Sequence, residues 1–143
     1  MTTDRRATIR VTHRFSQSPE RVFDAWLDPT KAKKFLFATP AGEMVRAEID
    51  ARVGGHFTFV DRRNGEHIEH VGEYLEIDRP RRLVFTFAVP KFSAERTTVI
   101  VEVTPCGKGC ELVLTHESVL PDYASRTEGG WKMIIEGLAA ALG

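Results

Sequence analysis

The chain has 143 residues, of which 42% are hydrophobic and 28% are charged, and its 20 lysines and arginines balance its 20 aspartates and glutamates. This length suits one domain that buries about 68–70% of its unfolded surface, so the core needs no metal or disulfide. The balanced charge argues against a nucleic-acid partner, because nucleic-acid-binding proteins usually carry a basic face.

The sequence also bears on location and domain organisation. No run of 18 apolar residues occurs, which argues against a transmembrane helix, and the polar residues 1–6 carry no secretory signal. Cys106 and Cys110 provide no disulfide framework. We therefore expect a cytoplasmic protein without membrane insertion, in which residues 1–143 form a single domain and residues 1–6 are disordered.

The first predicted elements are a strand and two short helices. Apolar residues alternate with polar ones over residues 7–15, and this period of two predicts a half-buried strand. Ser18 followed by Pro19 is typical of a helix start, so we predict a helix over residues 19–27, which Pro29 ends. A second short helix is expected over residues 30–35.

The middle of the chain, from Met44 to Glu117, is predicted to consist of strands and turns. Alternating apolar residues predict strands near residues 45–49, 57–59, 66–77, 83–89, 99–103 and 112–116. Arg63-Asn64-Gly65 is a hairpin signal. At Gly54-Gly55 we expect a positive φ or a bulge, because glycine tolerates both.

The last predicted element is the longest helix, over residues 124–142. Its apolar residues fall three and four apart and form one face that includes Trp131, Ile134, Ile135 and Leu138. The order of elements predicts an α+β fold with a curved antiparallel sheet of about six or seven strands. One helix cannot fill the concave side of so large a sheet, so we expect a cavity of about 300–1,000 Å³ between helix and sheet.

A set of motifs in this order resembles a known family. The motifs are Ser18–Trp26 with Asp28-Pro29, Asp50–Gly55, Gly72–Ile77, Pro80–Thr86 and Gly129–Trp131. They are similar to the activator of Hsp90 ATPase homologue 1-like family, within the START-like (SRPBCC) superfamily. The resemblance implies a helix-grip fold with a hydrophobic cavity but no universal reaction, since the superfamily includes lipid carriers, hormone receptors, polyketide cyclases and co-chaperone domains. Phe35 stands where many relatives carry a second tryptophan, and we expect this change to alter the opening of the cavity.

Candidate ligand-binding residues are aromatic side chains of the concave face and two histidines among apolar neighbours. They are Trp131, Phe57, Phe59, Phe85, Phe87, Trp26, His13 and His116. The aromatic side chains suit a ring-bearing or lipid-like ligand, although the same pattern is typical of ordinary core. In the family's topology the first and last strands are neighbours, so His13 and His116 can meet at one cavity wall. Alternatively, each is a hydrogen-bonded histidine near a strand end.

Neither a cofactor nor a metal site is predicted. His56, His67 and His70 suggest a cluster, but residues three apart on a strand face opposite sides of the sheet. The chain also lacks the Gly-x-Ser-x-Gly motif of a nucleophile elbow.

The sequence favours binding of a small hydrophobic molecule, with no defined reaction. Two alternatives stay open: a chaperone-associated or other protein-interaction module, and a cyclase-type enzyme that uses the cavity histidines. A protein partner and a homodimer also stay open, the latter because two-fold dimers are common.

Overall fold

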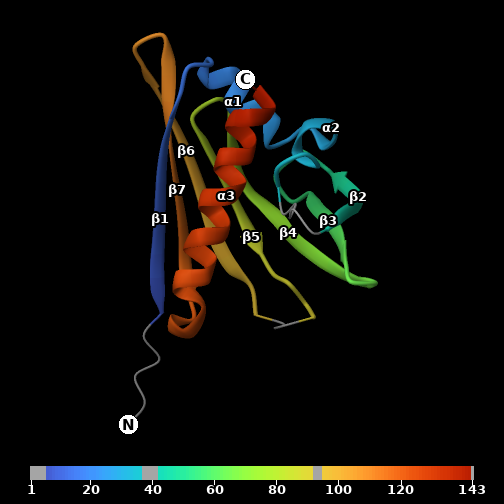
Figure 1. Cartoon of the computed structure of the whole chain (residues 1–143). Coiled ribbons are helices and arrows are strands. Elements are labelled where there is room, and N and C mark those ends of the chain that lie inside the picture. Colours follow the sequence, from blue (N-terminus) through green and yellow to red (C-terminus); the bar gives the residue numbers. More distant parts are fainter. Residues whose placement is uncertain (1–5, 37–41, 92–94, 143) are drawn as a thin grey trace.

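The computed structural model describes residues 6–36, 42–91 and 95–142, and it contains a seven-stranded antiparallel sheet that curves around the helices (Figure 1). The strands are β1 (Ala7–Phe15), β2 (Glu43–Ile49), β3 (His56–Arg63), β4 (Glu66–Asp78), β5 (Arg82–Phe87), β6 (Thr97–Cys106) and β7 (Gly109–Val119). The helices are α1 (Pro19–Ala25), α2 (Pro29–Ala32), the 3₁₀ helix η1 (Pro121–Tyr123) and α3 (Ala124–Leu142). The strand order is β1-β7-β6-β5-β4-β3-β2, which confirms the predicted α+β helix-grip architecture.

Residues 1–6 were expected to be disordered, and the structure describes one of them, Arg6. Residues 1–5 lie outside the described residues. Arg6, which the expectation included, is half-buried, and its Nη2 lies 2.9 Å from Oε1 of Glu95.

The first helix is shorter than the sequence predicted. It begins as expected, because the Ser18 hydroxyl accepts a hydrogen bond from the Arg21 amide at 3.3 Å. It ends at Ala25 rather than at residue 27, since the next two amides make tighter bonds to carbonyls three residues back. Asp28 then accepts a hydrogen bond from the Thr30 amide at 2.9 Å and so caps α2, which forms a single turn.

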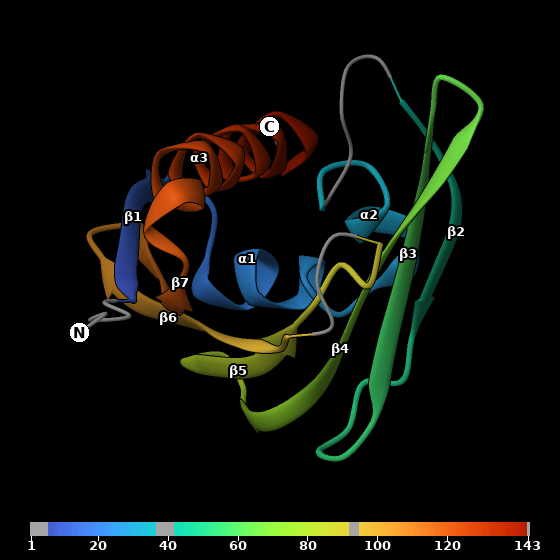
Figure 2. The ribbon, with the colours of Figure 1, turned by 90° about the horizontal axis from the view of Figure 1, so that it is seen from below.

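The sheet bends sharply, so that β2 and β3 stand across β5 and β6 when the molecule is seen from below (Figure 2). Gly54, in the turn that connects β2 to β3, has a φ of +85°, as expected for this glycine pair. A Cβ added to Gly55 would lie 2.2 Å from the Asp50 carbonyl oxygen, so no larger residue fits this turn. The Gly54 amide donates to the Tyr74 carbonyl at 2.9 Å and holds the turn against β4.

The middle of the concave face is filled by aromatic side chains of β3, β4 and β5. The rings of Phe57, Phe59, Tyr74 and Phe85 lie 5.4–6.4 Å apart, mostly edge to face. Gly72 allows this packing, because a Cβ there would lie 2.4 Å from the Phe57 ring. This part of the concave face is therefore solid core.

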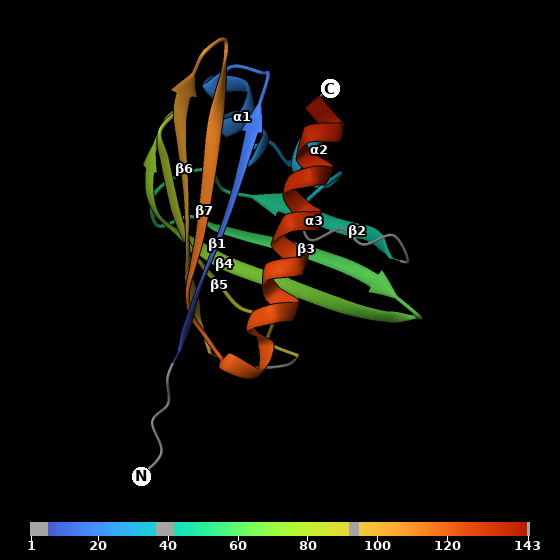
Figure 3. The same ribbon diagram turned by 60° about the vertical axis from the view of Figure 1, so that its left-hand side comes forward.

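The long helix α3 covers the open side of the curved sheet (Figures 1 and 3). It buries Trp131, Ile135 and Leu138, whereas Ile134 is only partly buried at the border of the apolar face. The Arg21 guanidinium donates to the Leu142 carbonyl at 3.3 Å and ties the end of α3 to α1. Neither α3 nor any other helix in the described ranges is long and apolar enough to cross a membrane.

The packing of α3 predicts a contrast between two of its apolar residues. Ile135 is 1% exposed and Met133 is 49% exposed. Ile135→Ala should lower the free energy of unfolding by about 2–5 kcal/mol, because it leaves a cavity in the core. Met133→Ala should change it by less than about 0.5 kcal/mol. Urea denaturation measures both, and equal losses would contradict this orientation of α3.

Candidate functional site

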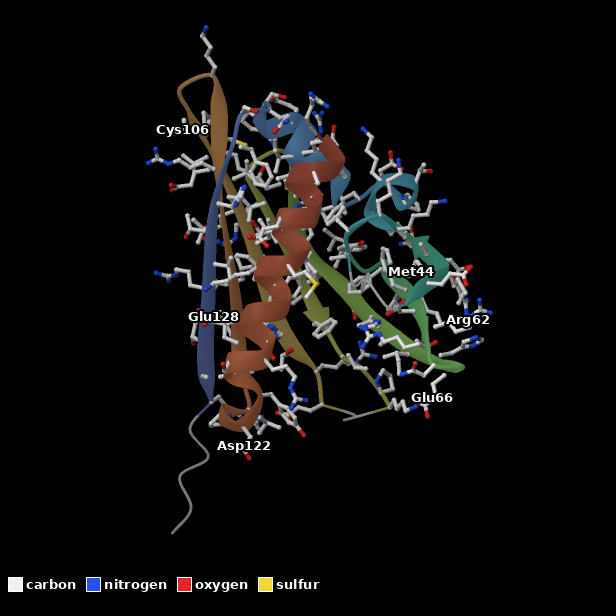
Figure 4. All side chains as sticks on the ribbon, viewed as in Figure 1. Met44, Arg62, Glu66, Cys106, Asp122 and Glu128 are labelled. Atoms are coloured by element: carbon white, nitrogen blue, oxygen red, sulfur yellow. The ribbon has the colours of Figure 1, made fainter. Side chains whose placement is uncertain are left out.

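A cavity of about 490 Å³ lies at the end of the molecule where α3 begins. Asp122 of η1 marks this end in Figure 4. The lining residues come from β3, β5, β6, β7, η1 and α3, and from the segments that precede β1, follow β5, precede β6 and follow β7: Arg6, Arg63, Phe87, Ala88, Val89, Glu95, Thr97, His116, Ser118, Val119, Leu120, Tyr123, Arg126 and Thr127. The volume falls in the expected range of about 300–1,000 Å³. The cavity occupies one end of the helix–sheet space rather than its whole length.

Two of the eight predicted ligand-binding residues, Phe87 and His116, line this cavity. Phe57, Phe59 and Phe85 do not, and each is at most 3% exposed because the aromatic packing of β3–β5 surrounds it. Trp131 does not line the cavity, but it is hydrogen-bonded to His116, which does. The structure therefore places most of the predicted aromatic set in the core.

Trp26 also belongs to the core. Its ring packs edge to face against Phe35 with centroids 5.5 Å apart, and it lies 6.4 Å from the ring of Trp131. The Trp26 indole N–H is buried and has no hydrogen-bond acceptor within the part of the chain that the structure describes. Phe35 thus contacts the core and does not lie at the cavity opening, contrary to the sequence-based expectation.

His13 does not meet His116, although β1 and β7 are neighbours. The register pairs His13 with Leu112 and His116 with Ile9. The two histidines are therefore four residues apart along paired strands, which is about 13 Å at roughly 3.3 Å per residue. His13 is half-buried against Phe15, with ring centroids 4.7 Å apart, and it lies outside the cavity.

His116 is held by hydrogen bonds on both ring nitrogens. The Trp131 indole N–H donates to Nδ1 at 2.9 Å, and Nε2 lies 2.6 Å from the Thr97 hydroxyl. An indole can only donate, so Nδ1 is unprotonated and the neutral ring carries its proton on Nε2. Nε2–H then donates to Thr97, whose hydroxyl donates to the Phe87 carbonyl at 3.3 Å. Each group in this chain therefore donates to the next, from Trp131 of α3 to the Phe87 carbonyl of β5.

This environment keeps His116 neutral. Burial lowers its pKa from 6.5 to about 4. Protonation of Nδ1 would also break the bond from Trp131, and the Nε2 proton is already given to Thr97. His116 therefore serves as a structural link and is poorly placed to act as a general base near neutral pH.

The ring of Phe87 forms the aromatic wall of the cavity. Phe87 is half-buried, and its ring is stacked 6.1 Å from His70. It meets His116 and Trp131 edge to face at 5.7 and 6.2 Å. Three neighbouring rings therefore fix its orientation, while part of its surface faces the cavity.

Four charged residues that line the cavity, Arg6, Arg63, Glu95 and Arg126, have side chains that reach solvent, and we call them the cavity mouth. These residues were not predicted from the sequence, since they come from four separate segments that only the fold brings together. Arg6 pairs with Glu95, and Arg63 donates from Nε to the wholly buried carboxylate of Asp61. The cavity thus has an apolar interior and an opening rich in arginine.

His70 is a second buried histidine, and its sequence position had suggested only a metal cluster, which the strand spacing argued against. As predicted, it faces the opposite side of β4 from His67, which is exposed, whereas His70 is 6% exposed. Burial lowers its pKa to about 4. The alternation of Ile68, His70, Gly72 and Tyr74 would have placed it on the inner face.

A bulge in β7 shapes the rim of the cavity. Two residue steps in β1, from Ala7 to Ile9, face three steps in β7, from His116 to Val119. Ser118 adopts a φ of +63°, which is uncommon for a residue with a side chain. The extra residue turns Val119 inward, so that it lines the cavity together with Ser118.

The two buried histidines predict a pH dependence of stability. Both have a pKa of about 4 in the folded chain and about 6.5 when unfolded. Between these values the unfolded chain binds more protons, so the stabilisation is complete above pH 6.5 and is lost as the pH falls. Between pH 7 and pH 5, the free energy of unfolding should fall by about 2 kcal/mol for each of the two histidines.

Urea denaturation across this range measures the effect in the wild type and in two variants. His116→Gln should remove about half of the pH dependence, while His67→Gln, on the exposed side of β4, should retain all of it. An unchanged slope in His116→Gln would show that His116 is not held neutral.

Comparisons with known proteins agree with this fold. The sequence profile of the family described as activator of Hsp90 ATPase homolog 1-like protein matches residues 16–143. No curated protein matches the chain. A solved structure from Chromobacterium violaceum is 27% identical with a TM-score of 0.85, covering 93% of this chain and 94% of its own.

Two further structures extend the likeness. A protein from Rhizobium loti is 25% identical with a TM-score of 0.82, covering 96% of this chain and 97% of its own. An AHSA1-like protein from Aeromonas hydrophila is 19% identical with a TM-score of 0.83, covering 95% of this chain and 92% of its own. The fold of this last protein is shared, although its sequence has diverged. With a profile that matches nearly its whole length, the chain belongs to the activator of Hsp90 ATPase homolog 1-like family, as the order of its motifs indicated.

Proposed function

We propose that the protein binds a small apolar molecule in the cavity beside Phe87. The observation that carries the proposal is a cavity of about 490 Å³ whose wall presents an aromatic ring held in place by three neighbouring rings. Ala88, Val89, Val119 and Leu120 add apolar surface around it. Such a site suits a ligand of one or two rings, which can stack on Phe87 without reorganising the wall.

A cyclase-type reaction that uses the cavity histidines receives less support from the geometry. His116 has both ring nitrogens engaged, and His13 lies outside the cavity. A general base needs a lone pair that reaches the substrate and a pKa near the working pH. His116 provides neither, so binding without chemistry is the simpler function for this site.

A docking module of the kind that the family description names, an activator of the Hsp90 ATPase, also receives less support. Protein-binding surfaces commonly show a contiguous exposed apolar patch. The large exposed apolar side chains of the described residues lie on separate elements: Val45, Val53, Leu75, Tyr123 and Met133. Val53 and Leu75 are neighbours, since the Gly54 amide donates to the Tyr74 carbonyl, but two such side chains make only a small apolar patch. The cavity, with its fixed aromatic wall, is therefore the better supported binding site.

Titration with the uncharged dye N-phenyl-1-naphthylamine, which fluoresces strongly in apolar surroundings, tests the proposal. The wild type should bind the dye with a fluorescence increase. Phe87→Ala should weaken binding about tenfold, which corresponds to about 1.4 kcal/mol of lost stacking and contact. Leu75→Ala removes an exposed side chain of β4 and should bind as the wild type does.

Two results would contradict cavity binding. One is the absence of dye binding to the wild-type protein. The other is equal binding to Phe87→Ala and wild type when circular dichroism shows that both are folded.

A further inference from the structure

Positive charges outnumber negative charges at the cavity mouth. Three arginines, Arg6, Arg63 and Arg126, line the cavity, whereas Glu95 is the acidic residue among the described lining side chains. They reach the cavity from β3, from the first turns of α3 and from the segments that precede β1 and β6. The guanidinium groups that line the cavity therefore come from three separate segments of the fold.

Protein carboxylates engage two of these arginines. Arg6 pairs with Glu95 at 2.9 Å, and Arg63 pairs with Asp61, which is wholly buried behind the wall. Arg126 differs, because its guanidinium lies 5.9 Å from the centre of the Tyr123 ring and makes no ion pair within the described residues. A contact with the face of a ring leaves the N–H edge of a guanidinium available to an anion.

The interior of the cavity has the opposite character. Phe87, Ala88, Val89 and Val119 form an apolar wall, and the polar groups of His116 and Thr97 are already bonded to one another and to neighbours. A charge deep in the cavity would lose its hydration without finding a free partner. A charge at the mouth stays in contact with water and meets arginine.

We propose that the ligand is an organic acid, with an apolar ring-bearing body against Phe87 and a carboxylate at the mouth bound by Arg126. This inference rests on the proposed function and names its ligand class. A guanidinium presents two parallel N–H groups to a carboxylate, which adds geometric selectivity to the attraction of charge. The same arginines repel a cationic ligand of equal shape.

Two ligands that share a ring system and differ only in the carboxylate measure what the carboxylate contributes to binding. Calorimetric titration with 2-naphthoate and with the uncharged 2-naphthamide compares a carboxylate with a carboxamide of nearly the same shape. The acid should bind about tenfold more tightly, the ratio for one charge-assisted hydrogen bond of about 1.5 kcal/mol. In Arg126→Gln the two dissociation constants should become equal within about twofold, because the charged donor is lost while the apolar wall remains.

Arg10→Gln is the matched control, since it removes the same charge from an exposed position of β1. It should keep the preference for the acid. Equal binding of acid and amide by the wild type, or an acid preference that survives Arg126→Gln, would overturn the inference while leaving the proposed binding function in place. Failure of both naphthalene ligands to bind would overturn the inference and the proposed function together.

Discussion

The buried hydrogen bond from the Trp131 indole to Nδ1 of His116 joins the long helix to the last strand, and the arrangement of the site depends on it. It fixes the tautomer of His116, which in turn fixes the direction of the bonds through Thr97 to the Phe87 carbonyl. Three elements that are distant in sequence, α3, β6 and β5, are thereby tied to β7. The chain of bonds ends at the Phe87 backbone, and the rings of His116 and Trp131 also contact the Phe87 ring, so the cavity wall rests on the same pair of core side chains.

The fold was largely predictable because its signals are local. Alternation of apolar residues identified the strands, Ser18-Pro19 identified the start of α1, and glycines identified turns such as Gly54. The ends of α1 and α2 were less predictable, since hydrogen bonds to carbonyls three residues back and the Asp28 cap decide them. Periodicity sets which face of an element is buried, whereas such bonds set where it stops.

The site was harder to predict because periodicity assigns a residue to the inner face without saying whether its neighbours fill the space. Phe85 and Phe87 have the same parity on β5, yet Phe85 is enclosed by other rings and Phe87 faces the cavity. His13 and His116 show a second limit, since neighbouring strands bring them together only if the register allows it. Arg6 and Arg126 meet at one opening through the tertiary fold, which no spacing in the sequence encodes.

The position of the cavity follows from the distribution of side-chain volume along the concave face. Where β3, β4 and β5 bend, large rings such as Phe57 and Tyr74 interlock, and Gly72 lets one ring approach the backbone. Towards the start of α3 the inward positions carry smaller residues such as Ala88 and Val119, so the same curvature leaves space. A sheet that is too large for one helix to cover thus becomes core at one end and cavity at the other. The bulge at Ser118 and the neutral His116 let the wall of that cavity include polar atoms without an uncompensated charge.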